Sequence, residues 1–208
     1  MAGVWAARVV PRITNAVLAT KSHHEVRERV CSGLSGRVVE LGFGSGLNVT
    51  HYPPAVERVS AVEPSELAWQ LASRRVAASP APVERAGLDG QQLPFDDDSF
   101  DSALSTWTLC TIPDAGAALR EVVRVLRPGG RLFFVEHGAA PDRSVRRWQD
   151  RLDPLQQRVF AGCHLNRDVT ALLTGAALAP QQLETYYVKG GPRPFTFLYE
   201  GYSVPVAR

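Results

Sequence analysis

Three glycines at alternate positions follow a short apolar run and form the most informative stretch of the sequence. The run covers residues 38–41, and Gly42, Gly44 and Gly46 come directly after it. A strand that ends in glycines lets the backbone approach a ligand closely, and the next helix offers free N–H groups there. A dinucleotide fingerprint, G-x-G-x-x-G, would need glycine at position 47, which is Leu47. The stretch therefore predicts a nucleotide-like cofactor with the different spacing E-x-G-x-G-x-G.

A second acidic residue supports this interpretation. Glu63 stands 17 residues past Gly46, at the end of the next strand that we expect, residues 59–62. A carboxylate in that place can accept hydrogen bonds from both hydroxyls of a ribose. A glycine-rich turn alone is often just a tight turn, but the order of strand, glycines, helix, strand and acid favours a cofactor site.

The elements that must position these residues follow from hydrophobic periodicity. Apolar runs predict strands at 37–41, 59–62, within 99–110, at 131–135, 183–188 and 195–203. Helical spacing predicts one helix through Leu67, Leu71 and Arg75, with a neighbouring row formed by Ala68, Ala72 and Val76. It predicts another helix over 117–126, which a turn at 127–130 ends. Alternating strands and helices indicate a parallel sheet covered on both faces. The segment 189–194 is too short for a crossover helix, so the last two strands should pair antiparallel.

Residues 1–35 differ from the rest of the chain. Apolar residues from Val4 to Leu18 recur at helical spacing, with Pro11 expected to break or kink the helix. Ser22 and Glu25 have the spacing of a capping box, which predicts a second helix running toward Leu34. Three interpretations remain open for this segment: a helical cap over one edge of the core, a flap over a ligand, or a loose contact with a membrane surface.

Length and composition exclude several classes of protein. The chain has 208 residues, enough for one domain, and 45% hydrophobic with 21% charged residues is ordinary for a globular fold. A net charge of +2 disfavours bulk nucleic-acid binding. The three cysteines, Cys31, Cys110 and Cys163, form no C-x-x-C pair, so we expect no metal site and a reducing, cytoplasmic location. No apolar run is long enough for a transmembrane segment.

Five motifs in order resemble the class I S-adenosylmethionine-dependent methyltransferases, more narrowly the methyltransferase type 11 and ubiquinone/menaquinone methyltransferase-like group. They are the segments 40–46, Glu63, 88–95, 96–106 and 126–132. The resemblance covers about residues 36–137 and departs from the family pattern at Phe43 and Leu88. It implies an α/β, Rossmann-like, doubly wound fold with a mostly parallel seven-stranded sheet and an antiparallel C-terminal edge strand. It also implies one domain over 1–208, divided into a helical cap (1–35), a cofactor-binding half (36–137) and an acceptor side with the last two strands (138–208).

The same resemblance implies S-adenosyl-L-methionine as cofactor and S-adenosyl-L-homocysteine as product. The cofactor-binding residues that it implies are Glu40, Gly42, Gly44, Gly46, Asn48, Glu63, Pro64, Asp89, Gly90 and Thr106. Methyl transfer is an in-line displacement, so alignment can supply most of the catalysis and a dedicated base is not required.

His137 is the candidate catalytic residue, because open α/β sheets bind ligands beyond the carboxyl ends of their strands. It is interpreted as a general base or acceptor-positioning group, or else as a histidine that fixes the following loop; His164 and His51 are weaker candidates. Signatures of DNA amino-methylating, cytosine C5 and metal-dependent catechol enzymes are absent, and Cys110 is interpreted as a core thiol.

The expected partner is a small-molecule acceptor methylated at sulfur or oxygen, without nucleic acid, and with at most weak peripheral membrane contact. Short segments around Asn48, Trp107, His137 and Cys163 resemble the methyltransferase-like thiol S-methyltransferases. Two alternatives stay open: a catalytically silent protein that binds S-adenosylmethionine, and a methyltransferase acting on RNA or protein. The sequence does not set the oligomeric state.

Overall fold

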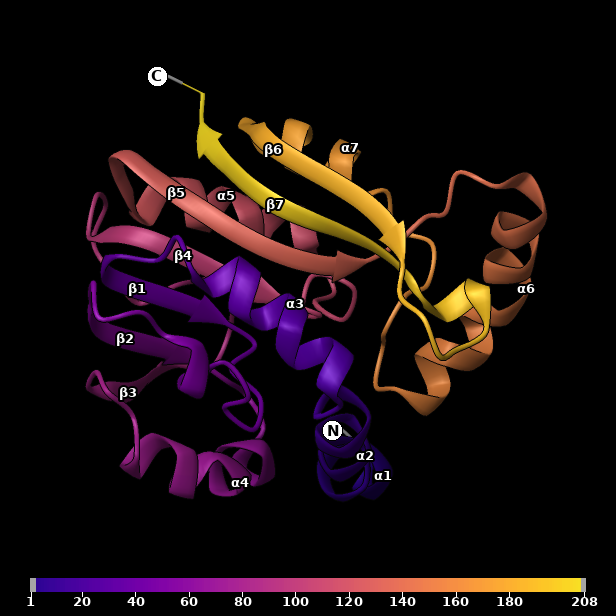
Figure 1. Ribbon diagram of the computed structural model, residues 1–208, viewed down its shortest axis with the longest axis horizontal. Helices are drawn as coiled ribbons and strands as arrows, with labels where there is room; N and C mark the ends of the chain where they lie inside the picture. Colours follow the sequence, from indigo (N-terminus) through magenta and orange to yellow (C-terminus); the bar gives the residue numbers. More distant parts are fainter. Residues whose placement is uncertain (1–2, 207–208) are drawn as a thin grey trace.

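One seven-stranded sheet forms the centre of the computed structural model, which describes residues 3–206 (Figure 1). The strand order is β3-β2-β1-β4-β5-β7-β6. The strands are β1 (Gly36–Leu41), β2 (Val56–Val62), β3 (Val83–Gly87), β4 (Phe100–Thr106), β5 (Leu126–His137), β6 (Leu178–Tyr187) and β7 (Phe197–Pro205). The helices are α1 (Val4–Arg8), α2 (Val10–Leu18), α3 (Lys21–Cys31), α4 (Glu66–Ala77), α5 (Ala115–Val125), α6 (Arg143–Val159) and α7 (Val169–Gly175), with short 3-10 turns η1 (Val49–His51) and η2 (Arg193–Phe195). Within residues 3–206, no helix combines the length and the apolar character needed to cross a membrane.

The sheet is mixed, as predicted. Strands β3, β2, β1, β4 and β5 are mutually parallel, whereas β7 is antiparallel to both β5 and β6. The expected Rossmann-like α/β architecture with antiparallel C-terminal pairing is confirmed. Because β7 lies between β5 and β6, the outermost strand on that side is β6.

Two hydrophobic cores lie on opposite faces of the sheet, since neighbouring strand residues point to opposite sides. Val39 belongs to the same hydrophobic cluster as Leu119 of α5 and Leu173 of α7. Its neighbour Val38 packs instead with Val30 of α3 and, through the same cluster, with Ala72 of α4. Helices therefore cover both faces, and the strands have fully buried centres, which is typical of parallel sheets.

Four local predictions differ from the structure. The third helix begins after Thr20, so Ser22 lies inside α3 and no capping box forms. The turn expected at 127–130 lies inside β5, where the register with β4 shifts between Phe100 and Ser102. The short strand β3 was not expected at all. The break at Pro11 is displaced by two residues, because α1 and α2 meet at Val9 and Pro11 falls in the first turn of α2, where proline is tolerated.

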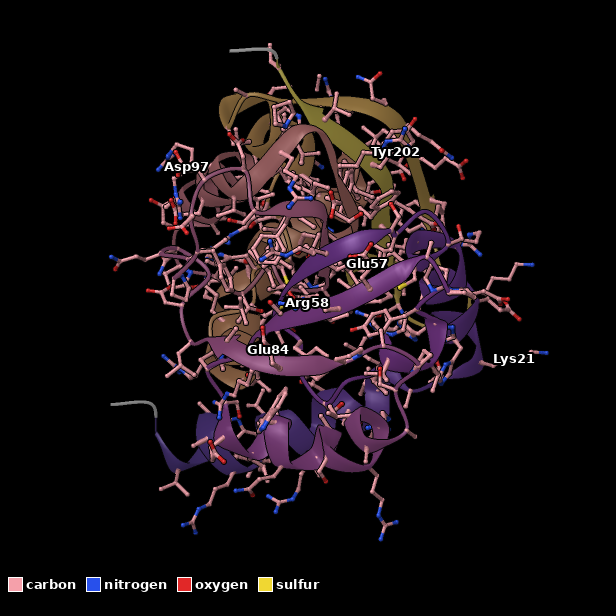
Figure 2. The ribbon with its side chains drawn as sticks, turned by 90° about the vertical axis from the view of Figure 1, so that its left-hand side faces the viewer. Lys21, Glu57, Arg58, Glu84, Asp97 and Tyr202 are labelled. Carbon is pink, nitrogen blue, oxygen red and sulfur yellow. The ribbon has the colours of Figure 1, made fainter. Side chains whose placement is uncertain are left out.

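The two ends of the parallel strands differ in what surrounds them. At the amino ends, Glu57, Arg58 and Glu84 lie near one another at the starts of β2 and β3 (Figure 2). At the carboxyl ends, the helices α1, α2 and α6 come together around the loops that follow β1, β4 and β5 (Figure 1). The residues whose side chains could take part in chemistry lie at the carboxyl ends of the strands.

Candidate active site

The glycine loop leaves the carboxyl end of β1 in a left-handed backbone conformation. Gly42, Gly44 and Gly46 have φ angles of 63°, 59° and 73°. Only glycine adopts this region at no steric cost. A Cβ at Gly42 would also collide with the side chain of Thr108, whereas a Cβ at Gly44 would come no closer than 3.8 Å to its nearest neighbour among the described residues. The backbone at Gly44 is therefore open to close approach by a ligand.

Glu63 ties this loop to the end of β2. Its side chain is only 6% exposed, and its two oxygens accept hydrogen bonds from Gly44 N (2.7 Å) and Ser65 N (2.6 Å). Burial raises the pKa of Glu63, and the two backbone N–H donors oppose that shift. Each carboxylate oxygen has two acceptor sites, so both oxygens can still accept a hydroxyl.

A buried polar network lies beneath the glycine loop. Glu40 is fully buried, and its carboxylate accepts hydrogen bonds from Asn48 Nδ2 (2.8 Å) and from the Tyr52 hydroxyl. Asn48 Nδ2 also lies 3.0 Å from Thr106 Oγ1, at the end of β4. Burial raises the pKa of Glu40 to about 7, against the opposing effect of these donors. The network joins the carboxyl ends of β1 and β4.

Arg27 brings the N-terminal segment into that network. Its Nη1 donates to Asn48 Oδ1 (2.5 Å) and Thr106 Oγ1 (3.1 Å), and its guanidinium stacks 4.7 Å from the centre of the Trp107 ring. Burial lowers the pKa of Arg27 to about 10. A charged side chain that is 3% exposed needs such partners to offset its desolvation.

The helices α2 and α3 both contact the chain after β1. Ser45 Oγ of the glycine loop donates to Asn15 Oδ1 of α2 at 2.7 Å. His24 Nδ1 of α3 lies 3.0 Å from His51 Nε2, in the turn η1 that follows the loop. Residues 3–35 thus cover the glycine loop as well as one face of the sheet, rather than only a sheet edge. Phe43 points away from this contact, since its ring is buried 5.4 Å from that of Trp69 on α4.

The remaining residues implied for the cofactor lie at the same end of the sheet. Pro64 is exposed beside Glu63, and Asp89 is exposed after β3, where its Oδ1 accepts from Gln91 N at 2.8 Å. A Cβ at Gly90 would lie 3.4 Å from Leu41 Cδ2, so this turn packs against the end of β1.

His137 lies at the end of β5 and faces two cysteines. Its Nε2 is 3.2 Å from Cys163 Sγ, which is 3.5 Å from Cys110 Sγ. The hydrogen bond between Cys163 and Cys110, together with His137, lowers the pKa of Cys163 to about 4 against the effect of burial. Burial alone would lower the pKa of His137, but Cys163, a backbone hydrogen bond and Glu136 together raise that pKa to about 9.

The other two histidine candidates are engaged elsewhere. The ring of His164 points to α6, with Nδ1 3.3 Å from Asp153 Oδ2. His51 pairs with His24 of α3. Among the three histidines, the structure places His137 at the carboxyl end of a central strand and next to nucleophilic side chains.

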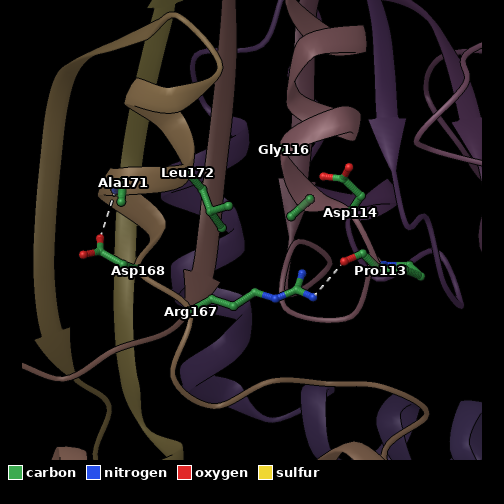
Figure 3. A pocket seen from close by; sticks show the side chains of 8 residues that line it. Pro113, Asp114, Gly116, Arg167, Asp168, Ala171 and Leu172 are labelled. Atoms are coloured by element: carbon green, nitrogen blue, oxygen red, sulfur yellow. Dashed lines mark hydrogen bonds between the residues drawn. The ribbon is translucent and has the colours of Figure 1, made fainter.

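A surface hollow of about 480 Å³ lies between α5 and α7 (Figure 3). It is lined by Pro113, Asp114, Ala115, Gly116, Arg167, Asp168, Ala171 and Leu172. The guanidinium of Arg167 extends across it to the backbone of the loop after β4, donating to Ile112 O (2.6 Å) and Pro113 O (3.3 Å). The glycine loop is not part of its lining.

Comparison with known proteins decides the family. Residues 39–134 match the model of a methyltransferase domain. The chain is 34% identical over 186 residues to human thiol S-methyltransferase TMT1B, covering 81% of this chain and 75% of that protein. The chain belongs to the class I S-adenosylmethionine-dependent methyltransferases.

Other relatives of this methyltransferase agree. It is 34% identical over 114 residues to a demethylmenaquinone methyltransferase of Clavibacter sepedonicus, covering 55% of this chain and 46% of that one. The crystal structure of the Bacillus subtilis YcgJ protein superposes with a TM-score of 0.70 at 16% identity, covering 89% of this chain and all of that one, which supports the fold.

The sequence did not reveal two parts of this methyltransferase site. Arg27 was not singled out, because a single arginine on a predicted helix carries no signal for burial. Cys110 is buried, as expected for a core thiol, but it also contacts Cys163 from 53 residues away. The available signal was the position of Cys110 at the end of the segment 99–110, which contains a predicted strand, and of His137 just past the predicted strand 131–135, since carboxyl ends of parallel strands meet at one edge.

Proposed function

We propose that this enzyme binds S-adenosylmethionine against the glycine loop and methylates the sulfur of a small, apolar thiol. The similarity to human thiol S-methyltransferase TMT1B, over three quarters of that protein, carries the proposal for sulfur. The cysteine and histidine side chains at the carboxyl ends of β4 and β5 add support, because the acceptor must meet the methyl group at this end of the sheet.

The residues of the site fit the cofactor. The open backbone at Gly44 permits close approach, and Glu63 keeps acceptor sites for the ribose hydroxyls. The remaining proposed contacts come from residues at the same end of the sheet: Glu40, Gly42, Gly46, Asn48, Pro64, Asp89, Gly90 and Thr106. When bound, S-adenosylmethionine supplies a methyl group that its sulfonium makes electrophilic.

The protein's own contribution is then binding and alignment. Residues 36–137 hold the cofactor, residues 3–35 cover the glycine loop and exclude water from it, and residues 138–206 surround the acceptor. Of the two catalytic roles considered for His137, we propose acceptor positioning. This role follows from the position of the ring at the end of β5, where Nε2 lies 3.2 Å from Cys163 Sγ.

A matched pair of acceptors tests the proposal. The purified enzyme is incubated with S-adenosylmethionine and either benzyl mercaptan or benzyl alcohol, and release of S-adenosylhomocysteine is measured. We expect release with the thiol only, at a rate that depends on enzyme concentration. Release with the alcohol or with a benzylamine, but not with the thiol, would refute S-methylation.

A further inference from the structure

Two cysteines and one histidine from three distant segments meet beside the proposed acceptor position. Cys110 lies in the loop after β4, His137 is the last residue of β5, and Cys163 lies in the turn after α6. Their ligand atoms all lie within 4.8 Å of one another. We propose that Cys110, His137 and Cys163 bind one Zn²⁺ ion, and that a thiol acceptor occupies its fourth coordination position. The zinc site is independent of the proposed function, whereas the role of the fourth position rests on it.

The spacing of the three ligand atoms suits zinc. Tetrahedral Zn²⁺ with Zn–S near 2.3 Å and Zn–N near 2.0–2.1 Å separates two sulfurs by about 3.8 Å, and a sulfur from a nitrogen by about 3.5 Å. The corresponding distances here are 3.5 Å between Cys163 Sγ and Cys110 Sγ, and 3.2 Å between Cys163 Sγ and His137 Nε2. These two distances need to open by a few tenths of an ångström. The third pair, Cys110 and His137, lies within 4.8 Å, and side-chain rotation must bring it to about 3.5 Å.

The donor set selects the ion and its coordination. Two thiolates and one imidazole favour a soft or borderline ion such as Zn²⁺ over Mg²⁺ or Ca²⁺. Three protein ligands are typical of catalytic zinc sites, which keep one position for water or substrate, whereas structural sites use four.

Backbone contacts hold the ligand-bearing segments together, as a preorganised site requires. His164 N donates to Cys110 O at 2.8 Å, which joins the turn containing Cys163 to the loop after β4. Arg167 fastens the same two segments through its hydrogen bonds to Ile112 O and to Pro113 O, of which Figure 3 shows the second. These contacts fix the backbone, so binding the ion needs side-chain movement only.

A zinc-bound thiol would be activated for the proposed reaction. On binding, the acceptor releases its proton to solvent and coordinates as a thiolate. A lone pair on its sulfur then forms a bond to the methyl carbon, and the bond from that carbon to the sulfonium breaks, its electron pair staying on the sulfur of S-adenosylhomocysteine. The thioether product is neutral and a weaker ligand, so it leaves the ion.

Metal analysis of the reduced, full-length enzyme tests the site directly. After chelation, gel filtration and reloading with Zn²⁺, elemental analysis should find one zinc per chain. Reloading with Co²⁺ should give the visible bands of tetrahedral cobalt and a near-ultraviolet thiolate-to-cobalt absorption. Cys110→Ala and Cys163→Ala should each lose these bands. Cys31→Ala, which removes the third buried cysteine, should keep them.

The outcomes separate the site from its role. Reduced wild-type enzyme that binds neither ion would overturn the site, and so would cobalt bands retained in both cluster variants. Benzyl mercaptan should shift the cobalt bands and benzyl alcohol should not. Equal thiol turnover with and without zinc would overturn the role in acceptor binding. One bound zinc with no turnover on any thiol would support the site and refute the proposed function.

Discussion

Replacement of Glu63 by alanine separates the binding of the ribose from the folding of the glycine loop. The variant loses the acceptor for Gly44 N and Ser65 N at a site that is 6% exposed. Leaving buried donors unpaired costs about 1–3 kcal/mol, and we expect a loss of that size in the free energy of unfolding. Loss of the two proposed ribose contacts should weaken binding of S-adenosylhomocysteine by about 1–3 kcal/mol, a change of roughly 5- to 150-fold in Kd.

Titration calorimetry and denaturant unfolding measure the two effects. Glu57→Ala is the matched control, because Glu57 is exposed at the amino end of β2, away from the loop (Figure 2). The control should bind like the wild type. An analogue of S-adenosylhomocysteine without ribose hydroxyls adds a second comparison: the wild type should bind it more weakly than the parent compound, and Glu63→Ala should bind both equally. A folded Glu63→Ala protein that binds within twofold of the wild type, or still discriminates between the two compounds, would refute the ribose assignment.

Three further predictions concern the same end of the sheet. Gly42→Ala should lower the free energy of unfolding by more than the roughly 1–2 kcal/mol that an alanine costs in the left-handed conformation, because the new Cβ also collides with Thr108. The control is Gly129→Ala, at φ 83°, where a Cβ meets no atom of residues 3–206 within 4 Å. Urea unfolding of this control should show the backbone cost alone. Burial raises the pKa of Glu40 from 4.5 to about 7, so its contribution to stability is complete below pH 4.5 and is lost as the pH rises through 7. The difference between the unfolding temperatures at pH 5 and pH 8 should therefore be smaller in Glu40→Gln than in the wild type. An unchanged difference would contradict the raised pKa. Arg27→Gln should speed hydrogen exchange in α3 and lower stability by about 1–3 kcal/mol, since it removes two buried charged hydrogen bonds, and unchanged exchange would count against that role.

The meeting of the glycine loop with Glu63 could be predicted because both follow strands directly in the sequence. Gly42 and Glu63 each follow an apolar run directly, and the parallel register then brings the ends of those runs together. The strand β3 escaped prediction for a related reason. It is five residues long, and its side chains are only partly buried, so Val83–Gly87 shows neither a continuous apolar run nor clear alternation.

The flanking segments could not be predicted to the same extent, because their partners are set by packing alone. Ser22 and Glu25 had the right spacing for a capping box, but α3 begins after Thr20, where the chain turns to place Arg27 beneath the glycine loop. A cap needs only two residues in the correct local conformation, whereas the burial of Arg27 depends on Asn48, which is far away in the chain. Local patterns do not carry that information.

The same reasoning explains where the acceptor is selected. The strands fix Cys110 and His137 at the carboxyl ends of β4 and β5, within the part of the chain proposed to hold the cofactor. Cys163 and Arg167 come from the segment after α6, and they complete the cluster and fasten it to the loop after β4. A change in residues 160–167 would therefore alter the acceptor side without moving Gly44 or its contact with Glu63. Because the contacts of this segment run to the loop after β4 and to His137 rather than to Gly44 or Glu63, substitutions in it should change the choice of acceptor while leaving the affinity for S-adenosylhomocysteine unaltered.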